Sequence, residues 1–287
     1  MTEQHQDSMN GKIVLITGAT SGVGRETALG LSKKGATLVL VGRSREKLDR
    51  VMSEIAEQTG NQQLDSLVCD LTSMGSVRKL ATDFRAKYRR LDVLINNAGE
   101  IVNGRRTTVD GYEYTLALDH LSHFLLTTLL MDILKASAPS RIINVSSSAH
   151  MFGHIDFNDL MGEKKYKAMR AYGQAKLANL LFTYELARRL AGTGVTANAL
   201  HPGVVRTNFG LGMKGRWRIL LMLGKPFTIN ARKGAETSIY LASSPEVTGT
   251  SGKYFAKKKE KKSSKESYDE SVAKRLWNES ARLTEVQ

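Results

Sequence analysis

The sequence is short of cysteine and of long apolar runs. Its single cysteine, Cys69, cannot form an internal disulfide, so we expect a reducing, cytoplasmic setting, with Cys69 as a small core residue at a strand end. No apolar run approaches the roughly 20 residues that a membrane-spanning helix needs. The first residues, MTEQHQDSMN, are polar, and we therefore expect a polar tail over 1–10 and no signal peptide or membrane anchor.

Internal repeats and low-complexity blocks are also missing before the basic run KKKEKKSSK at 257–265, which we expect to be a solvated loop. The pairs His120/His123 and His150/His154 have no clear third ligand nearby, so we expect no metal site. A hydrophobic content of 41% is typical of a soluble globular protein with a sizeable core.

The net charge is strongly positive, at +14 from 42 Lys and Arg against 28 Asp and Glu. Such a balance favours an anionic partner, which could be a phosphate-bearing cofactor, an acidic membrane surface or a nucleic acid. Because a nucleic-acid-reading motif and interleaved aromatic residues are missing, we expect no nucleic-acid partner.

Short apolar runs alternate with helical patterns along the whole chain. This alternation predicts an α/β fold: a single-domain Rossmann-type, doubly wound parallel sheet of about seven strands with helices on both faces. The expected strands are 12–17, 36–41, 64–69, 91–95, 140–146, 195–200 and 252–256. The expected helices are 23–34, 45–58, 74–88, a long stretch at 110–136, 168–191, 231–243 and 270–284.

A glycine-rich segment, TGATSGVGRE, follows the first strand and contains Gly18, Gly22 and Gly24. Glycines at the junction of a strand and a helix let the backbone approach a pyrophosphate, whose charge the helix N-terminus favours. The spacing differs from the common Gly-x-Gly-x-x-Gly pattern, and a plain tight turn is the alternative. Its position after the first strand favours dinucleotide binding.

The second strand ends in VGRSREK, where an acidic residue would favour NAD and a basic one NADP. Arg43 occupies this place, and a guanidinium can hold a 2′-phosphate through two hydrogen bonds, so we expect NADP(H). Arg45 and Lys47 are better interpreted as a solvated helix face. Asp70, after the third strand, could accept a hydrogen bond from the adenine amino group, and NNAG at 96–99 follows the fourth strand at the same sheet edge.

The segment AYGQAK places Tyr172 four residues before Lys176. On a helix these two side chains lie about 40° apart on one face. An ammonium group beside a phenol favours the phenolate, so Tyr172 could exchange a proton with a carbonyl or alcohol near neutral pH. Taken alone, the pair is more simply explained as a boundary tyrosine and a surface lysine. A serine run, NVSSSAH, ends the fifth strand and could hold the substrate oxygen.

The ordered set TGxxxGxG, NNAG, a serine after the fifth strand and YxxxK resembles the short-chain dehydrogenase/reductase family over roughly 11–256. A closer likeness to its retinol dehydrogenase-like members rests on the segments GYEYTLALDHLSHFLLTTLL, RIINVSSSAH, KLANLLFTYELARRL, LHPGVVRTN and RLWNES. The loop GHIDFNDLMGEKKY, which separates the serine run from the tyrosine, is similar to one in that group.

The resemblance implies roles for individual residues. Tyr172 would be the general acid/base, Lys176 would lower its pKa and hold the nicotinamide ribose, and Ser147 would polarise the carbonyl, with Ser146 and Ser148 as register alternatives. The residues implied to line the cofactor are Gly18, Ser21, Gly22, Val23, Gly24, Arg43, Asp70, Leu71, Asn97, Ala98, Gly99, Tyr172, Lys176, Pro202, Gly203, Val205 and Thr207. Asp119 stands where the family has a catalytic asparagine, and a carboxylate there could raise the pKa of Lys176 and lower activity.

The segment NFGLGMKGRWRILLMLGKPFTI corresponds to the family's substrate cover. We expect a substrate lid near 206–230, within a dinucleotide-binding and catalytic domain over 11–256, followed by a basic loop and C-terminal helix over 257–287. Its apolar residues are Trp217, Ile219, Leu220, Leu221, Met222, Leu223 and Phe227. They predict a hydrophobic carbonyl or alcohol substrate, although this stretch could instead pack as core, form a dimer contact or rest on an acidic membrane.

The leading hypothesis is an NADP(H)-dependent oxidoreductase that interconverts a hydrophobic aldehyde or ketone and its alcohol. The alternative is a catalytically weakened NADP(H)-binding regulator or scaffold, for which Asp119 is the support. The family resemblance also implies a homo-oligomer, dimer or tetramer, formed through the helices at 110–136 and 168–191.

Overall fold

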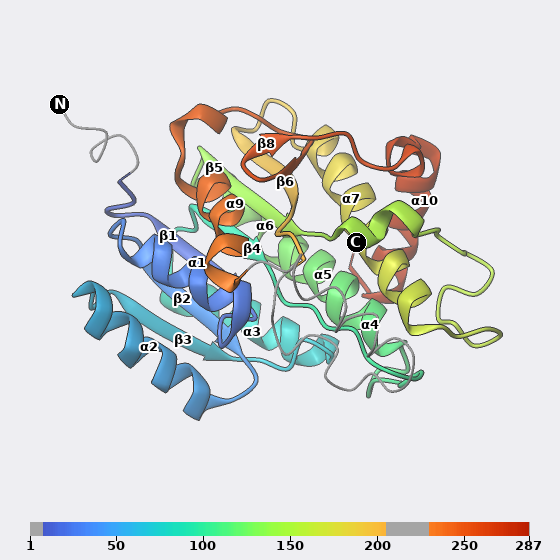
Figure 1. Cartoon of the computed structure of the whole chain (residues 1–287), viewed down its shortest axis with the longest axis horizontal. Coiled ribbons are helices and arrows are strands. Elements are labelled where there is room, and N and C mark those ends of the chain that lie inside the picture. Colours follow the sequence, from blue (N-terminus) through green and yellow to red (C-terminus); the bar gives the residue numbers. More distant parts are fainter. Residues whose placement is uncertain (1–7, 205–229, 287) are drawn as a thin grey trace.

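The structure is a computed structural model and describes residues 8–204 and 230–286. Within these residues one sheet runs through the molecule in the order β3-β2-β1-β4-β5-β6-β7-β8 (Figure 1). Its strands are β1 (Ile13–Thr17), β2 (Thr37–Gly42), β3 (Leu64–Val68), β4 (Val93–Asn96), β5 (Ser140–Val145), β6 (Val195–His201), β7 (Lys253–Ala256) and β8 (Lys259–Glu260). The pairs from β3 to β7 are parallel, and β8 is antiparallel to β7. The predicted doubly wound sheet is confirmed, with one short strand more than expected.

Helices cover both faces of this sheet. They are α1 (Gly22–Ser32), α2 (Arg45–Thr59), α3 (Met74–Lys87), α4 (Tyr114–Leu116), α5 (Ser122–Leu129), α6 (Met131–Ala136), α7 (Ala168–Arg189), α9 (Ala231–Ser243) and α10 (Glu270–Leu283). Residues of α1, α2 and α9 share one hydrophobic core, and those of α3, α5, α7 and α10 share the other. Within β1, Val14 and Ile16 point to the first core and Leu15 to the second, as the two-residue period of a strand requires.

Side-chain caps fix several helix starts. Ser44, Ser73, Asn230 and Asp269 each accept a backbone N–H from the first turn of the helix that follows. Gly60 ends α2 with φ 72°, a left-handed conformation that suits glycine. These signals explain why the predicted boundaries of most helices lie within a few residues of the observed ones.

The long helix predicted at 110–136 is wrong in its continuity. The chain there forms α4, a π-helical segment η2 (Ala117–Leu121), α5 and α6, with a break at Leu130 (φ −99°, ψ 7°). A π segment inserts an extra residue into a helical turn and is uncommon outside functional sites. Asp119 lies in this segment and is fully buried.

The C-terminal region forms more structure than a solvated loop. Lys257 and Lys258, with φ 53° and 60°, make the turn between β7 and β8, while the lysines of the run stay exposed. The short 3₁₀ helix η6 (Lys265–Tyr268) then leads into α10, which packs on α5 and α7 (Figure 1). The ring of Trp277 lies 5.0 Å from Phe124 and 5.7 Å from Phe182, between centroids.

Cys69 is a buried free thiol directly after β3, as the sequence predicts, and burial raises its pKa to about 11. Among residues 8–204 and 230–286, no helix combines the length and the apolar character that crossing a membrane requires.

Candidate active site

The strand order changes direction between β1 and β4, since β2 lies beside one edge of β1 and β4 beside the other. Ligands of doubly wound sheets bind at such a switch point, beyond the carboxyl ends of the strands. The glycine segment after β1, the NNAG segment after β4 and the serine run after β5 all lie at this edge.

The glycine turn is held tightly against β4. Gly18 and Gly22 have φ values of 66° and 56°, and a Cβ on Gly24 would lie 2.3 Å from the Gly18 carbonyl oxygen. Asn97 Nδ2 donates to the carbonyl oxygens of Thr17 at 2.8 Å and Gly18 at 3.3 Å, so its amide shapes the turn. Larger residues at Gly18 or Gly24 would displace this backbone.

The start of α1 is open to a ligand. Ser21, the N-cap residue, is exposed, and its hydroxyl makes no capping hydrogen bond to the helix. Val23 is half-buried in the first turn, and Ala98 is buried beside Gly18. A helix N-terminus without a side-chain cap presents backbone N–H groups that can bind a phosphate.

Arg43 lies directly after β2, with 60% of its side chain exposed. Its Nη1 donates to the Tyr114 hydroxyl at 3.1 Å, and its Nη2 lies 3.9 Å from Glu100 Oε2. Sequence reasoning missed Tyr114 and Glu100, because nothing in their spacing links them to the end of β2. Arg45 donates instead to Ser66 Oγ at 2.7 Å.

Asp70 is exposed after β3, and its Oδ1 accepts hydrogen bonds from the Thr72 backbone N–H at 3.0 Å and the Thr72 hydroxyl at 2.8 Å. These bonds fix its orientation at the carboxyl edge of the sheet. Leu71 is buried in the core and supports this loop from below.

Tyr172 and Lys176 both lie on α7 and are both buried, at 7% and 3% exposure. The Lys176 ammonium nitrogen lies 5.4 Å from the centroid of the Tyr172 ring, so the structure brings the two side chains together on one helix face. The ring of Tyr172 packs among Ile101 and Ala149. The candidate acid/base group therefore has an apolar wall on one side and a cation on the other.

A third charge completes this cluster. Asp119 Oδ2 lies 2.9 Å from Lys176 Nζ, and Asp119 Oδ1 accepts the Glu100 backbone N–H at 2.9 Å. Gly99 passes so close that a Cβ there would lie 2.8 Å from Lys176 Nζ and 2.9 Å from Asp119 Oδ2. Only glycine leaves room for this buried ion pair.

The three groups shift each other's pKa values. Burial raises the pKa of Asp119 to about 6, although the Lys176 ammonium opposes the rise. Burial disfavours the charge of Lys176, but Asp119 and Tyr172 together more than offset this and raise the lysine pKa. Burial also raises the pKa of Tyr172, against the lowering effects of Lys176 and of a hydrogen bond with Ser147. The lysine lowers the Tyr172 pKa as predicted, but the net shift is upward, because burial and the Asp119 charge outweigh the lysine.

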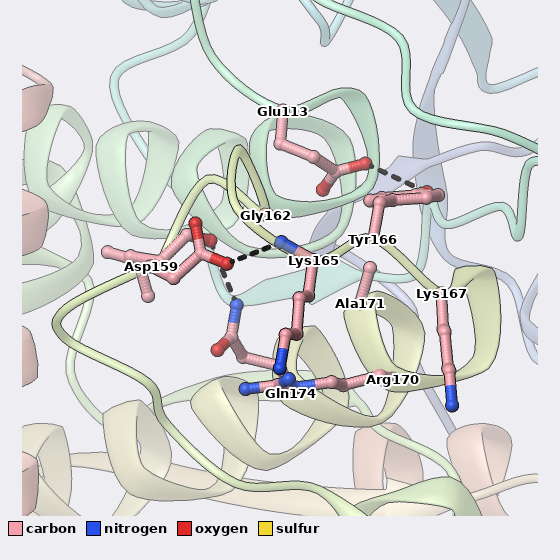
Figure 2. A pocket seen from close by; sticks show the side chains of 10 residues that line it. Glu113, Asp159, Gly162, Lys165, Tyr166, Lys167, Arg170, Ala171 and Gln174 are labelled. Carbon is pink, nitrogen blue, oxygen red and sulfur yellow. Dashed lines mark hydrogen bonds between the residues drawn. The ribbon is translucent and has the colours of Figure 1, made fainter.

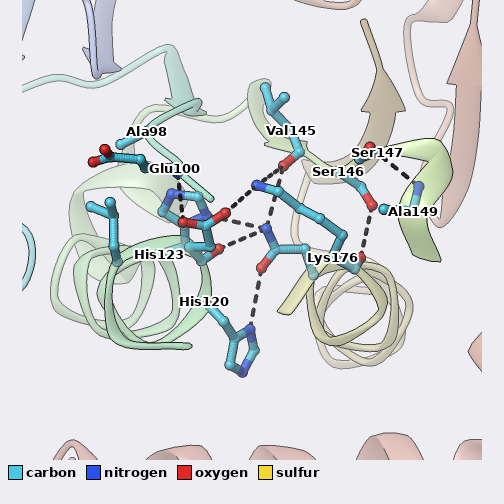
Figure 3. A network of polar contacts seen from close by, with 12 residues as sticks. Ala98, Glu100, His120, His123, Val145, Ser146, Ser147, Ala149 and Lys176 are labelled. Carbon is cyan, nitrogen blue, oxygen red and sulfur yellow. Dashed lines mark hydrogen bonds and ion pairs between the residues drawn. The ribbon is translucent and has the colours of Figure 1, made fainter. Parts of the chain in front are cut away.

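The three serines after β5 differ in their surroundings. Ser146 is buried and donates to the Lys176 carbonyl oxygen at 2.7 Å, whereas Ser148 is exposed and donates its backbone N–H to His201 Nδ1 at 3.2 Å. Ser147 is the serine that hydrogen-bonds Tyr172, and it also accepts the Ala149 N–H at 3.2 Å. In Figure 3, Ser146 and Ser147 follow Val145, and the side chain of Lys176 extends from α7 toward the same strand end. Of the three alternatives, Ser147 is the one whose side chain contacts Tyr172.

The histidine pairs take part in hydrogen bonds. Both rings of the first pair, His120 and His123, contact Asn179, at 3.2 Å and 3.4 Å. In the second pair, His150 Nδ1 lies 2.6 Å from the Ser147 carbonyl oxygen, and His154 Nδ1 lies 3.0 Å from Glu266. Within the described part of the chain, no three His, Cys, Asp or Glu side chains are grouped as a metal site would require.

The loop before α7 is anchored rather than loose. The Tyr166 hydroxyl donates to Glu113 Oε1 at 3.2 Å, and Gln174 Nε2 donates to the Leu160 carbonyl oxygen at 3.0 Å. Asp159 accepts three backbone N–H groups within the loop. Figure 2 shows the small pocket between these side chains and the start of α7. Hydrogen bonds of this loop therefore hold the start of α7, the helix that carries Tyr172.

Pro202 and Gly203 follow β6 at the same sheet edge, and Gly203 has φ 97°. Val205, Thr207 and the predicted lid at 206–230 lie outside the described residues, apart from Asn230, the N-cap of α9. Met151, Phe152 and Val204, which sequence reasoning missed, are large apolar side chains exposed by 55–60%. They follow the serine run and β6, so apolar surface lies next to the candidate site.

Comparison with known proteins agrees with this arrangement. The family described as "short chain dehydrogenase" matches residues 12–213. Retinol dehydrogenase 13 of Homo sapiens is 47% identical over 283 residues, which cover 96% of this chain and 86% of that protein. The crystal structure of an uncharacterized protein from Mycobacterium paratuberculosis is 33% identical, with a TM-score of 0.79, and covers 100% of this chain and 98% of that one.

A further solved structure contains a nicotinamide cofactor. The Pseudomonas aeruginosa RhlG/NADP active-site complex is 25% identical, with a TM-score of 0.71 over 87% of this chain and 96% of that one. The motifs, the sheet and these relatives give one assignment. The chain belongs to the short-chain dehydrogenase/reductase family and is retinol dehydrogenase-like, an oxidoreductase that binds a nicotinamide dinucleotide.

Proposed function

We propose that this protein is an NADP(H)-dependent oxidoreductase that interconverts a hydrophobic aldehyde or ketone and its alcohol. The observation that carries the proposal is the cluster of the buried Tyr172 and Lys176 with the half-buried Ser147 at the switch-point edge of the sheet. A proton donor, a cation and a hydroxyl converge there, which is the set that carbonyl reduction needs.

The residues present fit a dinucleotide. There is no room for a side chain at Gly18 or Gly24, the start of α1 lacks a side-chain cap, and Arg43 is exposed at the end of β2. Arg43 supports a 2′-phosphate and therefore NADP(H) over NAD(H). When bound, the nicotinamide supplies or accepts the hydride.

The chain's own residues would handle the proton and the substrate oxygen. Ser147 and Tyr172 would both hydrogen-bond the carbonyl oxygen, and Tyr172 would transfer its hydroxyl proton to that oxygen. The Lys176 ammonium would stabilise the phenolate that results, since it lies 5.4 Å from the ring centroid. The positive charge of a bound oxidised nicotinamide would act in the same direction.

Two observations support an apolar substrate. Met151, Phe152 and Val204 expose apolar surface after the serine run and after β6. The named relative at 47% identity is a retinol dehydrogenase, which acts on an apolar alcohol. From these two observations we propose a lipid-like, retinoid, steroid or aromatic carbonyl as the substrate class.

Two further proposals concern a membrane surface and a second copy of this chain. A peripheral contact with an acidic membrane is proposed from Arg216, Arg218 and Lys225, which lie in the lid outside the described residues. A homo-oligomer through α5 and α7 stays a prediction. Because α10 already packs on both of these helices, a second copy would meet only the part of their surface that α10 leaves free.

The alternative function, a weakened NADP(H)-binding regulator, is favoured by one observation. Asp119 raises the pKa of Tyr172 and pairs with the lysine that would otherwise act on the phenol alone. Such a regulator would still bind NADP(H), while proton transfer from Tyr172 would be slow.

The decisive experiment measures initial rates with NADPH and NADH against a panel of apolar aldehydes and ketones that includes retinal. Tyr172→Phe is assayed in parallel, and NADPH binding is followed by its fluorescence. Fast NADPH oxidation that the substitution abolishes supports the enzyme. NADPH binding without turnover on any substrate supports the regulator, and an equal preference for NADH contradicts the role of Arg43.

A further inference from the structure

The C-terminal helix α10 reaches the interior of the molecule beside the catalytic cluster. Ala273, Leu276 and Ser280 lie on one side of this helix and are buried to 1–2% exposure. The hydroxyl of Ser280 lies 2.9 Å from His120 Nε2. His120 belongs to the π segment η2 and directly follows Asp119. A residue near the end of the chain therefore contacts the turn that carries the buried carboxylate.

The direction of the Ser280–His120 hydrogen bond follows from the hydrogen bond between His120 and Asn179. His120 is buried, and burial lowers its pKa to about 4, so the ring is neutral and carries one proton. His120 Nδ1 lies 3.2 Å from Asn179 Oδ1, and an amide oxygen can only accept. The proton is therefore on Nδ1, which leaves Nε2 as an acceptor for the Ser280 hydroxyl.

The hydrogen bond from His120 also fixes the orientation of the Asn179 side chain. With Oδ1 facing His120, its Nδ2 donates to the Asp119 carbonyl oxygen at 2.8 Å and to the Val145 carbonyl oxygen at 3.3 Å. Lys176 Nζ lies 3.5 Å from that same Val145 oxygen. Figure 3 shows His120, Val145 and Lys176 around this network. Asn179 thus joins the π segment to the end of β5, from which Ser147 follows.

We propose that Ser280, His120 and Asn179 form a positioning chain through which α10 holds the π segment, and with it Asp119 and Lys176, in the catalytic arrangement. The proposal rests on the proposed function for its effect on turnover, and its structural part stands on the contacts alone. A π turn is an uncommon conformation that lasts where its surroundings support it. Here that support comes from a residue 160 positions further along the chain.

The test compares substitutions that remove a hydroxyl from the buried face of α10. Ser280→Ala removes the hydrogen bond to His120, and Ser280→Cys keeps the volume but offers only a weak donor. Thr284→Val is the matched control. Thr284 is buried to 1% exposure, and its hydroxyl donates to the Ser280 carbonyl oxygen at 2.6 Å, outside the positioning chain.

Three quantities are measured on the full chain: amide hydrogen exchange of peptides covering 114–123, the affinity for NADPH by fluorescence, and kcat and KM with the best carbonyl substrate. We expect faster exchange at 114–123 in both Ser280 variants, an unchanged NADPH affinity, and a fall in kcat of about tenfold with little change in KM. Thr284→Val should leave exchange at 114–123 and kcat at their original values.

Two results would overturn the positioning chain. One is unchanged exchange at 114–123 in folded Ser280 variants. The other is an equal increase in Thr284→Val, which would show that any loosening of α10 has the same effect. If the unmodified protein reduces no carbonyl on the panel, the proposed function fails, while the exchange experiment still decides whether α10 holds the turn.

Discussion

The carboxylate of Asp119 lies 2.9 Å from the ammonium nitrogen of Lys176, and both side chains are almost completely shielded from water. Lys176 therefore interacts with two groups at once, the phenol of Tyr172 and a full negative charge. In a buried setting the carboxylate competes for the lysine, which leaves less of its charge to stabilise a phenolate. We therefore expect the rate to depend on this competition.

Replacement of Asp119 by asparagine should raise turnover. Asp119→Asn removes the negative charge that raises the Tyr172 pKa, so the pKa of the phenol should fall. Because alcohol oxidation needs the deprotonated phenol, the rising limb of its pH–rate profile should move to lower pH. The rate at pH 7 should then increase about tenfold. The profile of kcat between pH 5.5 and 10 measures the shift.

Asp132→Asn is the matched control, since Asp132 is an exposed aspartate on α6 in the same helical stretch. It should leave the profile unchanged. If Asp119→Asn and Asp132→Asn give the same profile as the unmodified protein, Asp119 has no influence on Tyr172. A gain far above tenfold from a nearly inactive parent would favour the regulator over the enzyme.

A methyl group at Gly99 should disrupt the site. In Gly99→Ala the new Cβ would lie 2.8 Å from Lys176 Nζ and 2.9 Å from Asp119 Oδ2, so the ion pair must separate or the NNAG segment must shift. We expect kcat to fall by at least about 100-fold, as for a displacement of catalytic groups by about 1 Å. Gly75→Ala is the control, because its nearest neighbour would be 3.8 Å away. Retention of full activity by Gly99→Ala would show that the pair is not needed in this geometry.

Arg43 should decide between the two nicotinamide dinucleotides. Arg43→Ala should weaken NADPH binding by about 100-fold, which is the loss of a charged, bidentate phosphate contact, and should leave NADH binding almost unchanged. Arg45→Ala is the matched control, since Arg45 donates to Ser66 instead. Fluorescence titration measures both affinities, and an equal loss for NADH and NADPH would remove Arg43 from the 2′-phosphate site.

Glu100 should weaken the binding of NADPH at the Arg43 site. Glu100 Oε2 lies 3.9 Å from Arg43 Nη2, so the carboxylate attracts the guanidinium and would repel a phosphate. Glu100→Gln should tighten NADPH binding by about threefold, a modest effect because both side chains are largely exposed. The gain should shrink as salt is added. A tighter NADH complex of the same size would contradict this explanation.

Stability should fall in mild acid through buried imidazoles. Burial lowers the pKa of His201 to about 4, so between pH 6.5 and 4 the unfolded chain binds a proton at this ring that the folded protein does not. The unfolding free energy therefore decreases as pH falls through this window, by about 1.4 kcal/mol per pH unit for one such group. Asp119, with its pKa raised to about 6, acts in the opposite direction between pH 6 and 3.8.

Urea unfolding at pH 7.5, 6.5, 5.5 and 5.0 measures this slope. His201→Gln keeps an acceptor for the Ser148 N–H and should make the slope shallower by about one proton. His154→Gln is the control, since 68% of that side chain is exposed. An identical slope in all three proteins would show that His201 titrates alike in the folded and unfolded states.

Sequence reasoning reached the sheet and placed Tyr172 and Lys176 side by side because these signals are local. The apolar runs mark β1 to β7, and the four-residue spacing of Tyr172 and Lys176 places them on one helix face without knowledge of the rest. Asp119 comes instead from the family resemblance, which places it where the family has an asparagine. The direction of the Tyr172 pKa shift could not be obtained this way, because it depends on how deeply the ring and the carboxylate are buried.

The remaining parts depend on contacts between distant segments. Tyr114 meets Arg43 across 71 positions, and Ser280 meets His120 across 160, with no spacing rule that would connect them. The π segment differs from an α-helix by one inserted residue, which periodicity over so few residues cannot resolve. The strand β8 has two residues, both charged, and gives no apolar signal.

The position of α10 has a consequence for biosynthesis. A ribosome releases the sheet, α7 and the catalytic turn before it releases the segment that covers them, since α10 spans Glu270–Leu283. During that interval Phe124 and Phe182 lack the ring of Trp277, and His120 lacks Ser280. We therefore expect nascent chains that end before Glu270 to expose an aromatic surface attractive to chaperones. The protein would become competent only when α10 has left the exit tunnel.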